Sequence, residues 1–447
     1  MIPGPSPRLS TVSGIFLADE SRWVFQRRTK RIMVPASRTQ ICSITPVLPH
    51  ARVQHAGGTY VWQLHTALES ELGADVHYLV PDLPSNVLAS EDPTHARSFN
   101  LVARAGSTRH SLALKVYNFV RRVDPDVPYL PALLDLWCNR RWRAAIREAD
   151  VLDFQWSSWA RLIGLRRLGR GATTVVTLHD VTSQRGLRER NNAISRAQRL
   201  KWHLAYRTAL ASEQSLLRRA DHVIVFSEKD RALLDPRAIH SHIRVIPPPL
   251  ADSGAAGAAV SSSATVLFLG YFARAENRDG LIWFIESCWP SIRSAVPEAR
   301  LRVAGAGMSD ELRSRLEADR SIDLLGFVDD LNEVYEDVCV AVIPLLSGAG
   351  VKFKTVEPVV RGIPVVATAV GAEGVGEPDW YAGVSDDPKQ FSAAVADALL
   401  EPGAAFERAA RSREHARTVF GRESFLGHLR SVYLHEQSNH EEPAHGI

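Results

Sequence analysis

Residues 338–368 read VCVAVIPLLSGAGVKFKTVEPVVRGIPVVAT, and the order of features within them indicates the class of fold. The run at 338–345 is continuously apolar and rich in valine, which is typical of a strand buried on both faces of a parallel sheet. A glycine-rich turn follows at 347–350, a helix is predicted from about Val351, and 363–368 form a second apolar run. Strand, turn, helix and strand in this order predict a βαβ unit of an α/β domain.

The alternation of strands and helices extends outward from this stretch over most of the chain. Short apolar runs bounded by glycine or polar residues predict strands, and segments with apolar residues at helical spacing predict helices. Two such halves predict an α/β fold of two doubly wound domains that face a cleft, with ligands at the carboxyl ends of the strands. The other predicted strands are residues 39–45, 76–80, 151–155, 173–178, 221–227, 243–246, 265–269, 300–304 and 322–325, and predicted helices include 60–72, 190–219, 280–292 and 309–316.

A segment rich in Gly, Ala and Ser, ADSGAAGAAVSSSA at residues 251–264, predicts a flexible linker between the two halves. The charge changes sign near this linker. Residues 1–240 carry 34 Lys and Arg against 21 Asp and Glu, a net +13, whereas residues 241–447 carry 19 against 29, a net −10. This asymmetry predicts an anionic partner for the first half. Residues 1–38 are predicted to be a loose extension before a first domain at 39–250.

The composition excludes several classes of protein. With 447 residues, 45% of them hydrophobic and 23% charged, the chain has the proportions of a globular protein. No CxxC pair occurs, no signal-peptide pattern opens the chain, and no apolar run approaches the ~18 residues of a membrane span. We therefore expect a cytoplasmic protein, with peripheral contact at the inner membrane face left open. The four cysteines lie far apart, at Cys42, Cys138, Cys288 and Cys339.

The turn at residues 347–350 and the helix after it are the strongest candidate for a ligand site. Glycines allow close approach of the backbone, and the free N–H groups at a helix N-terminus favour an anion. Lys352 and Lys354 suit a phosphate, and Glu357, one turn further on, suits sugar hydroxyls. Neither GxxxxGK[ST] nor GxGxxG is present. The alternative, an ordinary strand–turn–helix with a solvated basic face, stays open.

Residues 347–375, SGAGVKFKTVEPVVRGIPVVATAVGAEGV, resemble the donor-site signature of the retaining glycosyltransferases of family 4, which have the GT-B fold. The resemblance is strong over residues 265–375 and weak over 39–250. It implies two Rossmann-like domains, an acceptor-binding one at 39–250 and a nucleotide-sugar-binding one at 265–420. It also implies a C-terminal helix, about 404–436, that crosses back to the first domain, with the crossing helix and tail at 421–447.

The resemblance implies a role for individual residues. Glu357 matches the Glu that holds the ribose hydroxyls of the donor, and Lys352 and Lys354 match basic positions near its diphosphate. His179 matches a first-domain His placed over the donor sugar, so that His179, Glu357 and Lys352 are the predicted catalytic residues. Further donor-binding positions are Gly270, Phe327, Val328, Gly348, Ala349 and Gly350, and Gly57 and Gly58 match a loop near the phosphate and the acceptor.

Three departures from the family pattern affect these expectations. Ala349 stands where the paired acidic motif has its first Glu, and Pro358 stands where the family usually has Ala. The Arg and Lys that often follow the strand ending at Gly270 are missing, so the phosphate charge falls more heavily on Lys352 and Lys354. Proline is tolerated in the first turn of a helix but is costly further in.

No metal or other cofactor is expected, because no Asp-x-Asp appears on a loop in a metal-site context. Asp329 and Asp330 are adjacent and are expected to cap a helix at 331, and Asp386 and Asp387 are expected to form a loop before a helix. His179 and Glu373 each have an ordinary structural alternative, as a hydrogen-bonded residue and a loop carboxylate. A basic stretch at residues 185–219 is either a solvated helical face or a surface for an anionic acceptor or a membrane. A nucleic acid is not expected, because no recognised binding module is present.

The resemblance implies a retaining glycosyltransferase that moves a sugar from a nucleotide-diphosphate sugar to an acceptor hydroxyl, with the leaving diphosphate as base. Polysaccharide, glycolipid or other glycoconjugate biosynthesis is the expected setting, and the acceptor is expected to be anionic or lipid-linked. Two alternatives stay open: an inactive sugar-nucleotide-binding scaffold, and another GT-B enzyme such as a nucleotide-sugar 2-epimerase.

Overall fold

The structure is a computed structural model. It describes residues 38–51, 56–81, 83–91, 99–102, 108–121, 124, 127–131, 139–169, 171–250, 259–261, 263–328 and 330–434. Residues 1–37 of the predicted extension, most of the predicted linker, and Cys138 lie outside this part of the chain.

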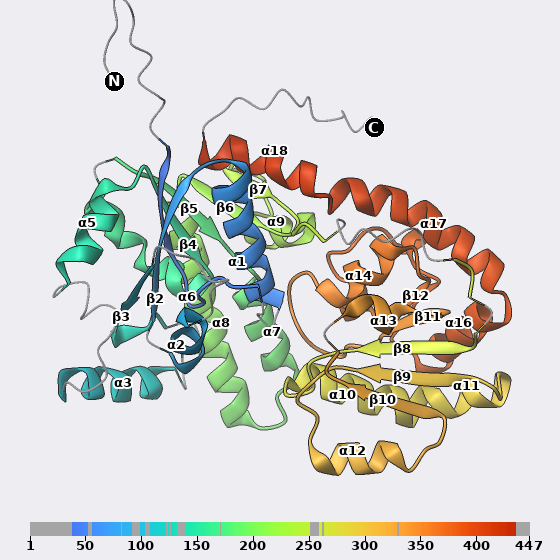
Figure 1. Cartoon of the computed structure of the whole chain (residues 1–447). Helices are drawn as coiled ribbons and strands as arrows, with labels where there is room; N and C mark the ends of the chain where they lie inside the picture. Colours follow the sequence, from blue (N-terminus) through green and yellow to red (C-terminus); the bar gives the residue numbers. More distant parts are fainter. Residues whose placement is uncertain are drawn as a thin grey trace, which may run out of the picture. The chain divides into compact units, whose positions relative to one another are not determined.

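The first lobe, defined here as β1 to β7 with their helices, is built on a parallel sheet (Figure 1). Its strand order is β3-β2-β1-β4-β5-β6-β7, so the order reverses between β1 and β4. Loops that leave the carboxyl ends of strands at such a switch point form the crevice where α/β sheets bind ligands. The strands are β1 Gln40–Ile44, β2 Asp75–Pro81, β3 Phe99–Val102, β4 Val151–Gln155, β5 Thr173–Thr177, β6 His222–Val225 and β7 Ile243–Val245.

The helices of the first lobe correct one prediction. The basic helix expected at about 190–219 is α8, which begins at Arg196, because a capping box at Ser195 and Gln198 starts a new helix. Residues 190–192 belong to the preceding helix, α7. Gly186 of α7 lies against the backbone of Tyr206 of α8, so the two helices pack closely. The helices are α1 Ala56–Thr66, η1 Ala67–Glu71, α2 Pro84–Ser90, α3 Thr108–Val120, α5 Arg140–Glu148, α6 Ser157–Ala160, η2 Arg161–Arg167, α7 Thr182–Asn192, α8 Arg196–Leu217 and α9 Glu228–Leu234.

The second lobe, defined as β8 to α17, repeats this plan with the order β10-β9-β8-β11-β12-β13, again all parallel. Its switch point lies between β8 and β11, and β11 is the apolar strand that leads into the turn at 347–350. The two-residue strand β13 was not predicted, because it is too short to show a period. The strands are β8 Thr265–Leu269, β9 Arg300–Ala304, β10 Ile322–Gly326, β11 Val340–Ile343, β12 Val365–Ala367 and β13 Gly383–Val384.

The helix cap predicted at Asp330 is confirmed, since Asp330 accepts from Asn332 N at 2.8 Å. Asp387, predicted to lie in a loop before a helix, caps that helix by accepting from Lys389 N at 3.0 Å. The helix expected from Gly280 begins five residues earlier, at Ala275, where the sequence is polar. The helices are α10 Ala275–Trp283, η3 Phe284–Cys288, α11 Trp289–Ala295, α12 Asp310–Glu317, α13 Leu331–Tyr335, α14 Phe353–Arg361, α15 Ala369–Ala372, η4 Pro378–Trp380, α16 Pro388–Leu400 and α17 Pro402–Val419; α18 Arg422–Tyr433 follows.

Pro358 is the sixth residue of α14, beyond the first turn where proline is well tolerated. The helix nevertheless continues to Arg361 and ends on Gly362, which has φ +75°. Ile363 N donates to Pro358 O at 2.9 Å and Gly362 N donates to Val359 O at 3.0 Å, which closes the helix in the manner of a Schellman motif. The helix is therefore continuous through Lys354 and Glu357 past Pro358, with Lys352 as its N-cap residue.

The predicted crossing helix is confirmed, as two helices rather than one. Figure 1 shows α17 continuing into α18, which lies beside the first lobe. Phe425, Leu429 and Tyr433 of α18 are fully buried in the same apolar cluster as Tyr60 and Phe226 of the first lobe. Burial of such side chains contributes about 1.5–3 kcal/mol each, so the end of the described chain is a structural part of the first lobe.

Candidate functional site

A cavity of about 630 Å³ opens where the carboxyl ends of the second-lobe strands meet α7 of the first lobe. Segments following β8, β9, β10 and β11 each contribute to its wall, as the switch-point argument predicts. Seven of the predicted site residues line it: Gly270, Phe327, Val328, Gly348, Ala349, Lys352 and Lys354. The first lobe contributes Ala56, Asp180, Arg185, Arg188, Glu189 and Asn192.

Gly350 explains how the turn at 347–350 meets the first lobe. Its φ is +71°, and a Cβ added there would lie 2.8 Å from the carbonyl oxygen of His179. Only glycine fits both the left-handed backbone and this contact. The turn and the segment of His179 and Asp180 are therefore neighbours, as the two predicted sites require.

Lys352 and Lys354 lie at the start of α14, and both are largely buried. Lys352 Nζ donates to Glu373 Oε2 at 3.1 Å, and Lys354 Nζ donates to Asn277 Oδ1. Burial lowers the pKa of Lys352 from 10.5 to about 8, against the opposing effect of Glu373. Burial lowers the pKa of Lys354 to about 7, against the opposing effect of Glu276. Both ammonium groups are therefore poorly solvated, and an anion in the cavity would stabilise their charged forms.

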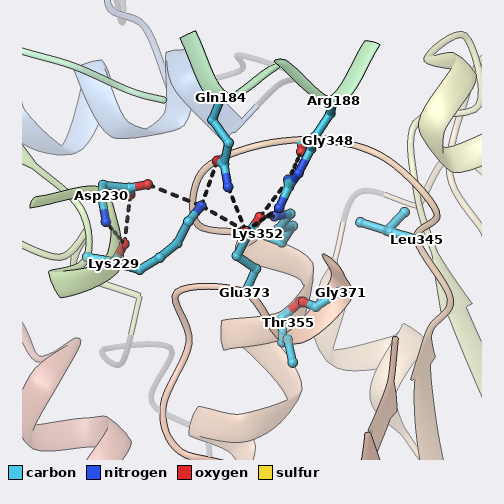
Figure 2. Close-up of polar contacts among 12 residues, drawn as sticks. Gln184, Arg188, Lys229, Asp230, Leu345, Gly348, Lys352, Thr355, Gly371 and Glu373 are labelled. Atoms are coloured by element: carbon cyan, nitrogen blue, oxygen red, sulfur yellow. Dashed lines mark hydrogen bonds and ion pairs between the residues drawn. The ribbon is translucent and has the colours of Figure 1, made fainter. Parts of the chain in front are cut away.

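Glu373 gathers cations from both lobes, as Figure 2 shows. Arg188 Nη1 donates to Glu373 Oε2 at 2.9 Å, and Lys229 Nζ lies 2.9 Å from Glu373 Oε1. Gln184 completes the set, accepting from Lys229 at 2.8 Å and donating to Glu373 at 3.0 Å. Burial alone would raise the pKa of Glu373, but Arg188, Lys352 and Lys229 outweigh it and hold the pKa at about 2.

The Glu373 cluster carries more positive than negative charge. Arg188, Lys229 and Lys352 face the carboxylates of Glu373 and Asp230, and Arg188 also donates to the carbonyl oxygen of Gly348 in the turn. Cations in excess at the wall of a cavity favour an anionic ligand. Arg188 belongs to the basic stretch, so part of that stretch is directed into the cavity rather than toward solvent.

Glu357 is not among the described residues that line the cavity. Its Oε1 accepts from Arg361 Nη2 at 2.9 Å and from Arg361 Nε at 3.2 Å. Burial raises the pKa of Glu357, and Arg361 opposes that rise. Arg361 in turn lies over the ring of Tyr335, 4.7 Å from its centroid. The predicted role of Glu357 at ribose hydroxyls stays a prediction, and in this structure its carboxylate is engaged by Arg361.

His179 is held in the first lobe by a stack and a hydrogen bond. Its ring lies on Trp156 with 3.7 Å between centroids and 7° between planes, and its Nε2 is 3.1 Å from Gln155 Oε1. The Gln155 amide nitrogen donates to Asp153 at 2.9 Å, so its oxygen accepts from His179. The proton of a neutral His179 therefore sits on Nε2. His179, Gly350, Gly57 and Gly58 lie outside the described cavity lining.

Asp153 connects this histidine to the crossing helix. Ser43 Oγ donates to Asp153 Oδ2 at 2.7 Å, and Tyr433 Oη of α18 donates to Asp153 Oδ1 at 2.8 Å. Burial raises the pKa of Asp153, and the hydrogen bonds from Gln155, Ser43 and Tyr433 oppose the rise. A chain of contacts thus runs from Tyr433 through Asp153 and Gln155 to His179.

Gly57 places the start of α1 against this stack. A Cβ at Gly57 would lie 2.6 Å from Trp156 Cζ2 and 3.4 Å from His179 Nδ1. Trp156 has φ +67°, a conformation that non-glycine residues rarely adopt. The close approach of α1 and the strained Trp156 together fix the plane of the His179 ring.

We expect Gly57→Ala to disturb His179 without unfolding the chain. The added methyl group must displace Trp156 or α1, which overpacking studies indicate costs about 1–3 kcal/mol. Tryptophan fluorescence, urea unfolding and the NMR titration of His179 measure the effect. Gly164→Ala is the matched control, because a Cβ at Gly164 meets no atom within 4 Å. Equal stability and equal His179 titration in the two variants would contradict the packing argument.

Several residues that shape the site were not among the predicted site residues. Gln155 is the last residue of β4 and Trp156 follows it, and the only sequence signal for them is the presence of polar Asp153 and Gln155 in an apolar strand. The sequence indicates Arg188 only as part of the basic stretch, and it gives no signal for Lys229. Glu373 was noted as a candidate with an ordinary alternative, and its three cations now explain its position.

Among the residues that the structure describes, no group of three or more His, Cys, Asp or Glu is placed to hold a metal ion. Within the same residues, no helix combines the length and apolar character needed to cross a membrane.

Family comparisons match both lobes. Residues 57–252 match the family model described as Glycosyltransferase Family 4, and residues 263–401 match the one described as Glycosyl transferases group 1. One relative, an uncharacterised 44.6 kDa protein of the cps region of Klebsiella pneumoniae, is 33% identical over 118 residues, or 25% of this chain. The match spans only 30% of that relative's length.

Solved structures share the fold over most of the chain. Sucrose-phosphate synthase from Thermosynechococcus elongatus matches with a TM-score of 0.63 and 20% identity, over 89% of this chain and 99% of that one. HepE from Anabaena, solved with UDP, matches with a TM-score of 0.62 and 12% identity, over 89% of this chain and 100% of that one. TarM from S. aureus, solved with UDP and α-GlcNAc-glycerol, matches with a TM-score of 0.62 and 11% identity, over 88% of this chain and 99% of that one. At these identities the likeness concerns the fold, the two-lobed GT-B arrangement.

Proposed function

Because the chain belongs to the family 4 glycosyltransferases, we propose that it transfers a sugar from a nucleotide-diphosphate sugar to an acceptor hydroxyl, with retention of configuration at the anomeric carbon. The setting we propose is polysaccharide, glycolipid or other glycoconjugate biosynthesis at the cytoplasmic side of a membrane. The second lobe would hold the donor and the first lobe would present the acceptor.

The observation that carries this proposal is the pair of buried lysines at the start of α14. Lys352 and Lys354 line the cavity beside the turn at 347–350, and burial lowers the pKa of each. A diphosphate there would meet two ammonium groups and the N–H groups at the start of a nine-residue helix. HepE and TarM, which share the fold, were solved with UDP, so a uridine nucleotide is the first donor to test.

The chemistry follows from where negative charge develops. As the bond between the anomeric carbon and the diphosphate oxygen breaks, that oxygen gains charge, and Lys352 and Lys354 would stabilise it. In a retaining transfer the acceptor hydroxyl attacks on the face that the diphosphate leaves, so the leaving phosphate oxygen can take the hydroxyl proton. His179, whose Nε2 proton is directed at Gln155, would lie near the donor sugar, as the segment of His179 and Asp180 contacts Gly350 of the turn. Metal independence is part of this proposal.

Incubation of the purified chain with a panel of labelled nucleotide sugars tests the proposal. We expect slow hydrolysis of one donor, and a rise in melting temperature with UDP, GDP or ADP according to which base is bound. Lys352→Ala should lose both effects, whereas Lys389→Ala, at an exposed position on α16, should keep them. Binding without turnover under any acceptor would instead indicate a sugar-nucleotide-binding scaffold. Inversion at the sugar C2 would indicate an epimerase.

A further inference from the structure

The basic stretch divides into two parts that serve different surfaces. Arg185 and Arg188 line the cavity, whereas the chain beyond them forms an exposed turn between α7 and α8. We call residues 190–207 the α7–α8 tip. No Asp or Glu occurs from residue 190 to residue 212, and this segment contains five Lys and Arg. Figure 1 shows the tip as the loop that joins the two green helices.

Aliphatic side chains project from the same tip. Ile194 is 96% exposed, Leu200 is 60% exposed and Leu204 is 45% exposed. Leu200 and Leu204 are four residues apart on α8, so they share one helical face. Apolar side chains this exposed, at three nearby positions, leave apolar area uncovered that a binding surface can use.

Cations lie around one of these apolar side chains, Leu200. A groove of about 420 Å³ is lined by Arg190, Arg196, Arg199, Leu200 and His203, so an aliphatic side chain lies among three guanidinium groups. Lys201 Nζ lies 5.2 Å from the centroid of the Trp202 ring, and the Arg190 guanidinium lies 5.8 Å from that of Tyr206. These aromatic contacts hold basic side chains at the base of the tip.

We propose that the α7–α8 tip docks on an anionic lipid bilayer, with Ile194, Leu200 and Leu204 entering the headgroup boundary and Arg196 and Arg199 contacting lipid phosphates. A bilayer surface is the partner that uses both components, since cations attract anionic headgroups and aliphatic side chains partition among the acyl chains. A nucleic acid would use the cations but not the aliphatic side chains. A second copy in a two-fold dimer would place like charges opposite one another.

The location of the tip gives this docking a consequence for the reaction. Arg188, Glu189 and Asn192 of α7 line the cavity, and Ile194 follows Asn192 by two residues. A bilayer on the tip would therefore lie beside the mouth of the cavity and would supply an acceptor anchored in the membrane. This last step rests on the proposed function, whereas the docking itself does not.

Co-sedimentation with vesicles tests the docking, using phosphatidylcholine alone and phosphatidylcholine mixed with phosphatidylglycerol. The wild-type chain is expected to bind the mixed vesicles, and to lose binding at high salt. Arg196→Glu with Arg199→Glu is expected to lower the partition coefficient about thirtyfold or more. Ile194→Asp with Leu200→Asp is also expected to lower the partition coefficient, although the Lys and Arg residues of the tip are unchanged. The matched controls are Arg320→Glu with Lys389→Glu, and Leu400→Asp, which are exposed positions of the second lobe.

Several results would overturn the inference: no binding by the wild-type chain, equal binding by tip and control variants, or equal binding to both vesicle types. Loss of a dimer in the tip variants, seen by analytical ultracentrifugation, would assign the tip to self-association. If the wild-type chain binds RNA but not vesicles, and only the variant Arg196→Glu with Arg199→Glu loses RNA binding, the tip would be assigned to nucleic acid. Donor hydrolysis without vesicles should be the same in wild type and tip variants, so a failure of the proposed function is seen separately from a failure of docking.

Discussion

Lys352→Met is expected to lower kcat/KM for the nucleotide sugar by about 10²–10³-fold. This is the loss typical when one hydrogen-bond donor that stabilises a developing anion is removed. The folded chain should tolerate the change, because Glu373 keeps Arg188 and Lys229 as partners and a poorly solvated ammonium is removed. Steady-state kinetics with the donor identified by the nucleotide-sugar panel measure the effect. Lys389→Met is the control. Unchanged turnover in Lys352→Met would remove Lys352 from the catalytic set.

The pH dependence of nucleotide binding provides a second readout for Lys352. An anion binds the charged lysine, and burial lowers the pKa of Lys352 to about 8 and that of Lys354 to about 7. UDP affinity should therefore fall as pH rises from 7 to 9, and protons should be taken up on binding at pH 8. Calorimetry in buffers of different ionisation enthalpy detects that uptake. Lys352→Met should lose the part of the pH dependence centred near 8.

Glu373→Gln is expected to lower the free energy of unfolding at pH 7 by about 2 kcal/mol. The pKa of Glu373 falls from 4.5 to about 2 on folding, a shift that corresponds to about 3 kcal/mol, and screening at a site that opens onto the cavity lowers this value. Because the folded pKa is depressed, the stabilisation is complete above pH 4.5 and is lost as pH falls toward 2. Urea unfolding at several pH values should show the difference between wild type and variant closing over that range.

Glu407→Gln is the matched control for Glu373→Gln. Glu407 pairs with Arg411 at 2.9 Å one helical turn away, but the two side chains are 73% and 69% exposed. Exposed pairs of this kind contribute about 0.3–0.5 kcal/mol. An equal effect of the two substitutions at pH 7 would show that the Glu373 cluster contributes no more than an ordinary surface pair.

The sequence predicted those parts of the fold whose signal is local. Apolar runs predicted β8 and β11, and a run of β-branched residues predicted β5. Glycines directly after β8 and in the turn at 347–350 lie in the wall of the cavity. The break between α7 and α8 was missed because the cap at Ser195 lies inside a run of basic residues. The start of α10 was missed because its first five residues, 275–279, contain no long apolar side chain to show a helical face.

In the candidate site too, the sequence predicts the residues that are placed by local spacing but not the contacts between distant segments. Lys352 and Lys354 follow the turn directly, so spacing alone placed them near it. The Glu373 cluster joins residues 185 positions apart, and the contact of Gln155 with His179 depends on the pairing of β4 with β5. Pair contacts of this kind are set by tertiary packing, which a single sequence does not display. Arg361 lies four residues after Glu357 on one helix, a spacing that the sequence shows and at which an ion pair forms.

The hydrogen bond from Tyr433 to Asp153 has a consequence for biosynthesis. The two residues are 280 positions apart, and β1 to β7 are all translated by residue 245. At about 5–20 residues per second, the ribosome reaches Tyr433 on the order of tens of seconds after Asp153. During that interval the apolar surface that later receives Phe425 and Leu429 lacks its cover, and the contacts that orient His179 are incomplete. The first lobe would therefore complete its packing, and the contacts that support His179, only after α18 has been translated.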